Sequence, residues 1–256
     1  MSRDRVTKIL CAAEPRGVSP ALEHLVEAAR QRDDVHALAL VGDLGTGDPA
    51  AYRALFRLLA STELPTYWVP GPGDAPVDHY LREAYNIEIV IPFLRGLHGT
   101  MAFAPGHVLF AGFGGEVDDD PDAPRQESAR LSYPRWEAEY RLKLVRELAE
   151  HELVLLLATP PAHKGHGTTG SEALAELVGS HRPRVVVCGG ERRSETLGRS
   201  LVVAPGALDD GRYAVVDLHS REVAFAELAT AAACGRAVRS RPAHPPACRA
   251  GGQRRT

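Results

Sequence analysis

The chain has 256 residues, of which 44% are hydrophobic and 25% are charged, as is ordinary for a globular protein. No apolar run reaches the ~18 to 20 residues that a membrane span requires, and the first residues lack the apolar stretch of a signal peptide. The four cysteines have no Cys-x-x-Cys spacing and are too few for a disulfide scaffold. These features predict a cytoplasmic protein without a membrane segment.

The net charge of -3 is unevenly distributed along the chain. Residues 229–256 hold six arginines and no acidic residue, so residues 1–228 carry a net charge of -9. An acidic body argues against a nucleic-acid-binding surface as the main feature. Residues 229–256 are rich in Ala, Arg and Pro without periodicity, which predicts a disordered tail outside one domain of residues 1–228.

In the first half of the chain, strand patterns alternate with helix patterns. Continuous apolar runs, typical of strands buried on both faces, predict strands at 8–13, 37–41 and 66–69. Ser19 and Asp48, each followed by proline, mark the starts of two helices. A third helix is expected after Asp74, which we expect to cap it, and further strands are expected near 87–91, 100–104 and 107–112.

The second half begins with an acidic, Pro-containing stretch at 117–132 that predicts an exposed loop. A helix is expected over about 134–150, with four large residues at i+4 steps: Trp136, Tyr140, Leu144 and Leu148. A second helix is expected at 171–180, between strands at 153–158 and 184–188. The chain then continues without helices, with strands at 200–204, 212–217 and 221–226. This order predicts an α/β layered domain with mixed sheets.

Polar or Gly-rich turns directly follow five of the predicted strands. They are Glu14–Gly17, Gly42–Asp43, Gly71–Asp74, Thr159–Pro161 and Gly189–Arg193. Ligands of open α/β sheets bind at the carboxyl ends of the strands, so these turns are expected to converge on one edge. Any one of them alone is most simply a tight connection, but five together indicate a shared site.

In their order and spacing, these turns resemble the motifs of the calcineurin-like metallophosphoesterases. That family reads Asp-x-His, Gly-Asp, Gly-Asn-His, a lone His and Gly-His-x-His, and these residues hold two metal ions that activate a water against a phosphoester. The resemblance covers about residues 7–228 and includes the closing run from Leu197 to Asp217. It is closest to a bacterial subgroup that carries Pro-Gly-Pro-x-Asp-Ala-Pro, here Pro70 to Pro76. It implies a four-layer α/β/β/α sandwich.

Matched residue by residue, most of the family's metal-ligand positions are replaced. Asp-x-His reads Glu14-Pro15-Arg16, whereas Gly-Asp is intact as Gly42-Asp43. Gly-Asn-His reads Gly71-Pro72-Gly73, the lone His corresponds to Ala158, and Gly-His-x-His reads Gly189-Gly190-Glu191-Arg192. The resemblance therefore leaves Glu14 and Asp43 as residual metal ligands and puts Arg16 and Arg192 in place of two histidines.

A guanidinium group cannot bind a metal, because it stays protonated and has no free lone pair. We therefore expect no dinuclear centre. Arg16 and Arg192 could pair with Glu14 and Asp43 as a structural salt-bridge cluster. They could instead form an anion pocket, with backbone N–H donors from glycines 71, 73, 189 and 190.

The predicted function follows from these alternatives. It is a metallophosphoesterase-fold protein with weak or no phosphoesterase activity that binds a small phosphate-containing ligand or a partner, without a cofactor. The alternative is an active phosphoesterase that uses a divalent metal such as Mn, Fe or Zn in a rearranged or mononuclear site. A dinucleotide-binding domain fits poorly, because the first turn, Glu14–Gly17, has no GxGxxG, and a serine hydrolase fits poorly, because no GxSxG is present. The oligomeric state is left open, and a homodimer is one possibility.

Two further groups of residues are weaker candidates for metal binding. His163 and His166 follow Pro160-Pro161 on a Gly-rich loop and could ligate a metal, although histidines on such loops are more often solvated. An acidic run could bind a hard cation such as Ca²⁺, although an exposed acidic loop is the simpler interpretation. The run comprises Glu116, Asp118, Asp119, Asp120 and Asp122.

Overall fold

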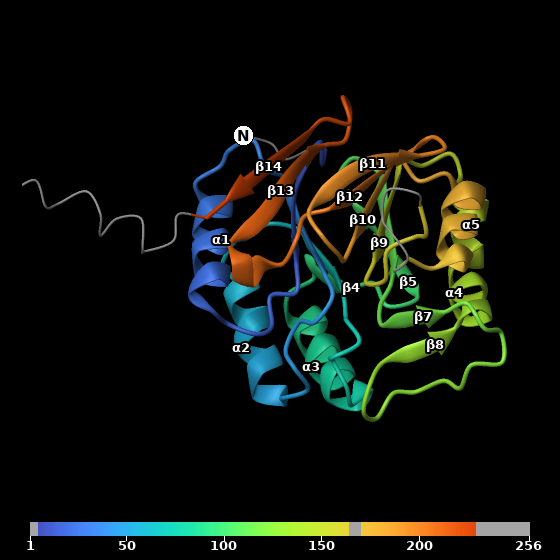
Figure 1. The fold of residues 1–256 in the computed structure, drawn as a ribbon. Coiled ribbons are helices and arrows are strands. Elements are labelled where there is room, and N and C mark those ends of the chain that lie inside the picture. Colours follow the sequence, from blue (N-terminus) through green and yellow to red (C-terminus); the bar gives the residue numbers. More distant parts are fainter. Residues whose placement is uncertain (1–4, 164–169, 229–256) are drawn as a thin grey trace, which may run out of the picture.

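The computed structural model describes residues 5–163 and 170–228. Two six-stranded sheets face one another, and helices cover the outer face of each sheet (Figure 1). The expected four-layer α/β/β/α sandwich with mixed sheets is confirmed. In the described ranges, no helix combines the length and the apolar composition needed to cross a membrane. The predicted disordered tail at 229–256 and His166 lie outside the described residues.

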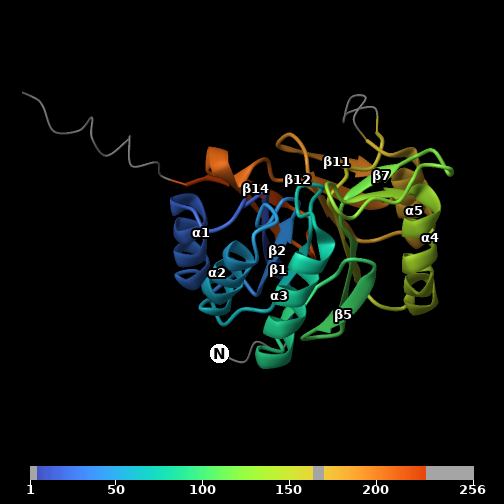
Figure 2. The same cartoon turned by 90° about the horizontal axis from the view of Figure 1, so that it is seen from below.

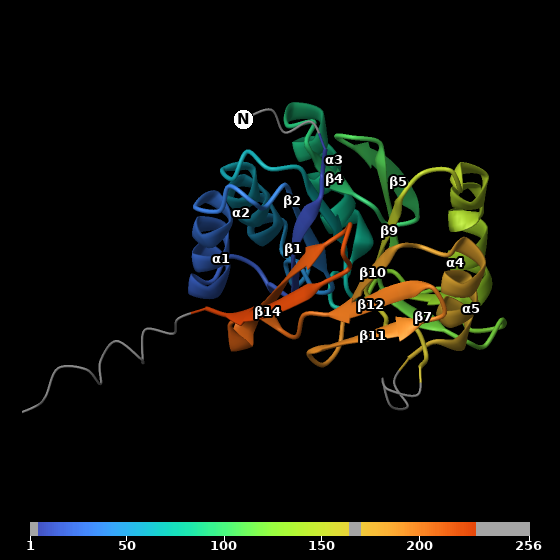
Figure 3. The same ribbon diagram turned by 90° about the horizontal axis from the view of Figure 1, so that it is seen from above.

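The first sheet has the strand order β14-β13-β1-β2-β3-β4. Its parallel part consists of β1 (Lys8–Ala13), β2 (Ala37–Val41), β3 (Thr66–Val69) and β4 (Leu94–Gly96). The antiparallel strands β13 (Arg212–Asp217) and β14 (Val223–Glu227) extend it beyond β1, as Figure 3 shows. The final strands of the chain thus return to the first one.

The second sheet has the strand order β11-β12-β10-β9-β6-β5. Four strands are parallel: β12 (Ser200–Ala204), β10 (Val185–Cys188), β9 (Leu153–Leu157) and β6 (Val108–Phe113). Antiparallel strands close both edges, namely β11 (Arg193–Leu197) and β5 (Thr100–Ala104). After β6, the short strand β7 (Glu116–Asp118) pairs with β8 (Ser132–Pro134).

Three long helices pack on the first sheet: α1 (Pro20–Arg30), α2 (Pro49–Ala60) and α3 (Val77–Val90). The second sheet is covered by α4 (Arg135–Leu142), the 3₁₀ helix η1 (Lys143–Leu148) and α5 (Glu172–His181). Figure 2 shows the two helical layers on opposite sides of the sandwich. Ser19 and Asp48 cap α1 and α2 as predicted, because their side chains accept from the N–H groups of Leu22 and Ala50.

The core between the sheets explains the continuous apolar strands. Alternate residues of each central strand face this core, as Cys11, Val41 and Leu156 do, while the residues between them face a helix layer. Across the gap, the rings of Tyr67 and Phe110 stack with centroids 4.0 Å apart. Both faces of these strands are therefore buried among apolar side chains, and polar residues can be placed only at the strand ends.

Five features differ from the sequence predictions. Residues 87–91 do not form a strand, because α3 continues to Val90 and β4 begins at Leu94. The helix expected over 134–150 is α-helical only to Leu142 and continues as η1. The stretch at 117–132 is mostly exposed, but its ends belong to β7 and β8. The sequence analysis did not predict the strand β11. Asp74 does not cap α3, whose N-cap is Pro76 without a side-chain hydrogen bond.

Candidate functional site

The turns that follow the strands line one cavity of about 400 Å³. The first sheet contributes Glu14, Arg16, Gly42, Asp43, Pro72 and Gly73. The second sheet and the segments attached to it contribute Glu116, Val117, Asp119, Arg130, Ala158, Thr159, Pro160, Gly170, Ser171 and Gly189. The expected convergence of the turns is confirmed. A groove of about 480 Å³ lies elsewhere, between α3 and β5, and none of these turns lines it.

The turn after β1 has an unusual backbone. Glu14 and Arg16 have φ of 52° and 47°, a left-handed conformation that is costly for residues with a side chain. Hydrogen bonds to the turn after β2 hold it, because the Glu14 and Arg16 N–H groups donate to the carbonyls of Val41 (2.9 Å) and Asp43 (3.0 Å). The Arg16 guanidinium then donates to Glu14 Oε2 at 2.7 Å and lies 3.6 Å from Asp209.

Asp43 is held by the turn after β3. Its Oδ1 accepts a hydrogen bond of 2.7 Å from the Gly73 N–H. Gly71 passes so close that a Cβ there would lie 2.1 Å from the Asp43 nitrogen and 2.2 Å from Oδ1. Only glycine fits at position 71, so the sequence Gly71-Pro72-Gly73 fixes the direction of the Asp43 carboxylate.

Asp74 forms the floor beneath these turns. It is fully buried, and its carboxylate accepts from the N–H groups of Leu44 (2.8 Å), Gly45 (2.8 Å) and Gly71 (2.7 Å). The Tyr52 hydroxyl donates to the same carboxylate at 2.9 Å. Burial raises the pKa of Asp74 to about 6, although these donors oppose the shift. Asp74 therefore joins the turns after β2 and β3 instead of capping α3.

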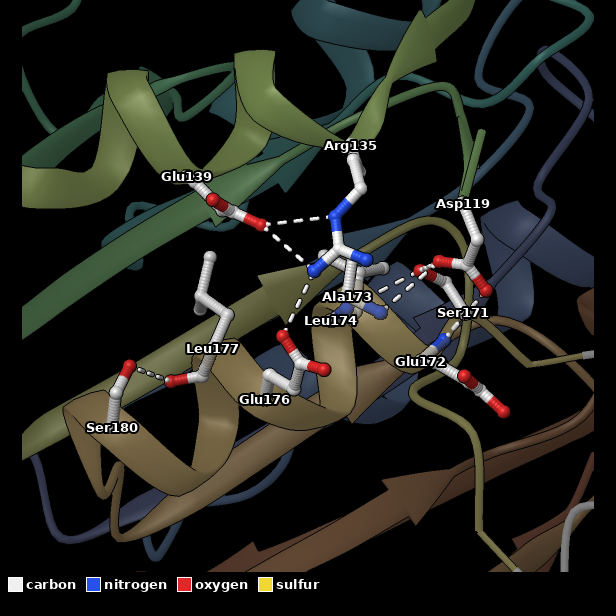
Figure 4. A network of polar contacts seen from close by, with 10 residues as sticks. All are labelled: Asp119, Arg135, Glu139, Ser171, Glu172, Ala173, Leu174, Glu176, Leu177 and Ser180. Carbon is white, nitrogen blue, oxygen red and sulfur yellow. Dashed lines mark hydrogen bonds and ion pairs between the residues drawn. The ribbon is translucent and has the colours of Figure 1, made fainter. Parts of the chain in front are cut away.

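The opposite wall carries a second set of paired charges. Arg130 Nε donates to Glu116 Oε2 at 2.6 Å. Asp119 caps α5 across 52 residues of sequence, since it accepts from the Ser171 hydroxyl (2.6 Å) and from the N–H groups of Glu172 (2.8 Å) and Ala173 (3.0 Å), as Figure 4 shows. Burial opposes ionisation of Asp119, but these donors outweigh it and lower its pKa.

Thr159 connects this wall to strand β9. Its hydroxyl accepts from the Val117 N–H at 3.2 Å and donates to the Gly115 carbonyl at 3.1 Å. The residue directly follows Ala158, the position that matches the lone histidine of the family. The site therefore keeps a polar group one residue beyond that position, but this group supports the backbone.

The structure brings together only some of the predicted site residues. Glu14, Arg16, Asp43 and Gly73 line the cavity. Gly71 lies beside it, but its N–H donates to Asp74, and the Gly73 N–H donates to Asp43, so these two glycines do not offer free donors to an anion. Gly189 lines the cavity, whereas Gly190 does not.

The expectation that Arg192 shares this site is wrong. Its guanidinium pairs with Glu227 and lies 5.1 Å over the ring of Phe225, both on β14. His163 does not line the cavity, and its Nδ1 lies 2.5 Å from Glu195 on β11. The second arginine of the cavity is Arg130, for which the sequence held no motif. Glu116 and Asp119 belong to the acidic run that the sequence did single out.

The side chains of this cavity do not fit a dinuclear metal centre. Over 5–163 and 170–228, no three His, Cys, Asp or Glu side chains are grouped as a metal ion would need. The two residual ligand candidates are also engaged, Glu14 by Arg16 and Asp43 by the Gly73 N–H. Arg16 also offsets the charge of Glu14, which weakens the attraction of that carboxylate for a dication.

Comparisons with known proteins identify the family. The sequence profile described as "Metallophosphoesterase, calcineurin superfamily" matches residues 48–228. The crystal structure of TT1561 of Thermus thermophilus is 40% identical in sequence, with a TM-score of 0.83 over 88% of this chain and 100% of that one. Among curated proteins, no sequence matches this chain.

More distant structures share the fold alone. A 5'-nucleotidase from Candida albicans SC5314 has a TM-score of 0.56 at 10% identity, over 86% of this chain and 52% of that one. A phosphopantetheinyl hydrolase from Mycobacterium tuberculosis has a TM-score of 0.54 at 13% identity, over 80% of this chain and 90% of that one. From its cavity, its sandwich and the profile match, the chain belongs to the calcineurin superfamily of metallophosphoesterases.

Proposed function

We propose that this protein uses the metallophosphoesterase fold to bind a small phosphate-containing ligand directly with arginines, and that it has little or no phosphoesterase activity. The observation that carries the proposal is the Arg16–Glu14 contact of 2.7 Å in the cavity. It places a fixed positive charge among the residues that match metal ligands in the family. A guanidinium group matches the geometry of a phosphate group and can donate two hydrogen bonds to it.

Two arginines are available for such a ligand. Arg16 comes from the turn after β1 and Arg130 from the loop before β8, so they reach the cavity from different sheets. Their side chains are 48% and 55% exposed. Each guanidinium has five N–H donors, and its carboxylate contacts use only part of them. Each guanidinium therefore keeps N–H groups that a phosphate group in the cavity could use without breaking the existing pairs.

The proposed lack of strong hydrolysis rests on the same residues. The reaction of the family needs a metal-activated water, and the described cavity residues do not fit a dinuclear centre. Pro72 and Gly73 stand where the family has its amide ligand and its histidine, and neither supplies a side-chain base. Binding is thus the activity that the remaining groups support.

The test is calorimetric titration of the full chain with inorganic phosphate in the presence of EDTA. We expect binding by the native protein and an affinity about tenfold or more weaker for Arg16→Gln and for Arg130→Gln, because each loses a charge-assisted hydrogen bond. Arg212→Gln is the matched control, since Arg212 is similarly exposed and paired with Asp210 outside the cavity. Equal affinity for all four proteins, or binding only with added metal, would contradict the proposal.

One observation favours a second candidate function, an active phosphoesterase with a rearranged or single-metal site. Four carboxylates line the same cavity: Glu14, Asp43, Glu116 and Asp119. This alternative predicts turnover of bis-p-nitrophenyl phosphate with Mn²⁺ that Asp43→Ala abolishes. Our proposal predicts no such Mn²⁺-dependent turnover above that of the Asp43→Ala variant.

A further inference from the structure

Three large side chains form an exposed stripe on the outer surface of the second helical layer. Trp136 and Tyr140 on α4 and Leu144 on η1 follow one another at i+4 steps and are 51%, 62% and 56% exposed. Figures 1 and 2 both show α4 on the outside of the sandwich. Contiguous exposed apolar groups of this kind mark interaction surfaces.

The stripe does not contribute to the core. The opposite face of the same segment supplies Ala138, Leu142 and Val145, which are buried against the second sheet. Glu137 is also buried and pairs with Arg141 at 2.6 Å. The fold is therefore complete without Trp136, Tyr140 and Leu144, and burying these three side chains requires another molecule.

Charges of both signs flank the stripe. Glu139 is half exposed and is held from one side by Arg135, which also contacts Glu176 of α5 (Figure 4). One turn further on, the Lys143 ammonium lies 4.5 Å over the Tyr140 ring. Arg146 is exposed on the next turn. A surface that carries both signs in this order suits a partner with the reverse order.

A second copy of the same segment provides that reverse order when it runs antiparallel. With a two-fold axis near residue 141, Glu139 of each copy lies opposite Lys143 of the partner subunit. The same arrangement sets the Trp136 ring opposite Arg146 of the partner subunit, a cation–π pair. Tyr140 of each copy then lies next to the axis. Each contact occurs twice, as an isologous interface requires.

We propose that this stripe is the interface of a homodimer, in which the α4–η1 segments of two copies pack antiparallel. The stripe supplies the apolar centre of the interface, and the Glu139–Lys143 and Trp136–Arg146 contacts set its register. An acidic or a basic partner surface would complement only one of the two charges. The self-complementary order therefore favours a second copy over a partner of either sign.

Sedimentation equilibrium of the full chain tests the interface. We expect a species of twice 27.6 kDa for the native protein and a monomer for Tyr140→Glu/Leu144→Glu. Ile89→Glu is the matched control, since Ile89 is 82% exposed on α3, away from the stripe, and its replacement should leave the dimer intact. A native protein that stays monomeric, or a dimer that survives the double replacement, would overturn the proposal.

A charge exchange tests the register independently of stability. Glu139→Lys places a lysine opposite Lys143 of the partner subunit, so we expect the dissociation constant of the dimer to rise about tenfold or more. Glu139→Lys/Lys143→Glu restores opposite charges across the axis and should recover most of the native dissociation constant. A double variant that dissociates as readily as Glu139→Lys would refute the antiparallel register.

Discussion

Replacing Asp74 tests how the turns after β2 and β3, which line the cavity, are held together. Its carboxylate accepts from three backbone N–H groups, those of Leu44, Gly45 and Gly71, and from the Tyr52 hydroxyl, all in a fully buried position. Asp74→Ala leaves these four donors without their acceptor. At about 1 kcal/mol for each buried donor, the low end of the usual range, the free energy of unfolding should fall by about 4 kcal/mol.

Urea unfolding followed by tryptophan fluorescence measures this loss, since Trp68 is fully buried in the core beside α2 and α3, whereas Trp136 is already half exposed in the folded protein. Asp33→Ala is the control, because Asp33 is exposed and its loss should change stability by less than about 0.5 kcal/mol. A decrease of less than about 1 kcal/mol for Asp74→Ala would show that the turns after β2 and β3 do not depend on this carboxylate.

Two further predictions concern glycine and pH. Gly71→Ala should destabilise the fold by more than about 2 kcal/mol, because the added Cβ would overlap the Asp43 backbone. Gly179→Ala in α5 adds a Cβ that meets no atom within 4 Å, so it should stabilise the fold by about 0.5–1 kcal/mol. Thermal unfolding of the two variants compares these effects, and equal effects would contradict the close packing at Gly71. Burial, reinforced by Arg141, lowers the pKa of His98 to about 4 from its ordinary 6.5. As pH falls from 6.5 to 4, the unfolded chain takes up a proton at His98 that the folded chain does not, so His98 should lower the free energy of unfolding by up to about 3 kcal/mol. Urea titrations measure this contribution as the difference between the native protein and His98→Gln, because Asp74, whose raised pKa acts in the opposite direction, is common to both.

Much of the fold could be predicted because each central strand is buried on both faces. Such strands read as short continuous apolar runs, and the caps at Ser19 and Asp48 fix where α1 and α2 begin. The prediction failed at 87–91, where β-branched residues end a helix. Ile89 and Val90 are exposed there, so their strand propensity was not evidence of a buried strand.

The site was predictable at the level of turns but not of side-chain directions. The turns had to converge because parallel strands carry their carboxyl ends to one edge. Which way Arg192 points depends on Phe225 and Glu227, which are adjacent only after β14 has joined the first sheet. Arg130 reaches the cavity because the loop before β8 folds back onto Glu116, a path that no local pattern specifies.

The claim that arginine has replaced metal chemistry in this cavity is tested most directly by metal content. The purified full chain is incubated with excess Mn²⁺, desalted and analysed by inductively coupled plasma mass spectrometry, in parallel with the Asp43→Ala variant. We expect less than about 0.1 Mn²⁺ per chain for both proteins, because the described residues group no three metal-ligating side chains and Arg16 pairs with Glu14. One or two tightly held ions per chain, lost in Asp43→Ala, would contradict it.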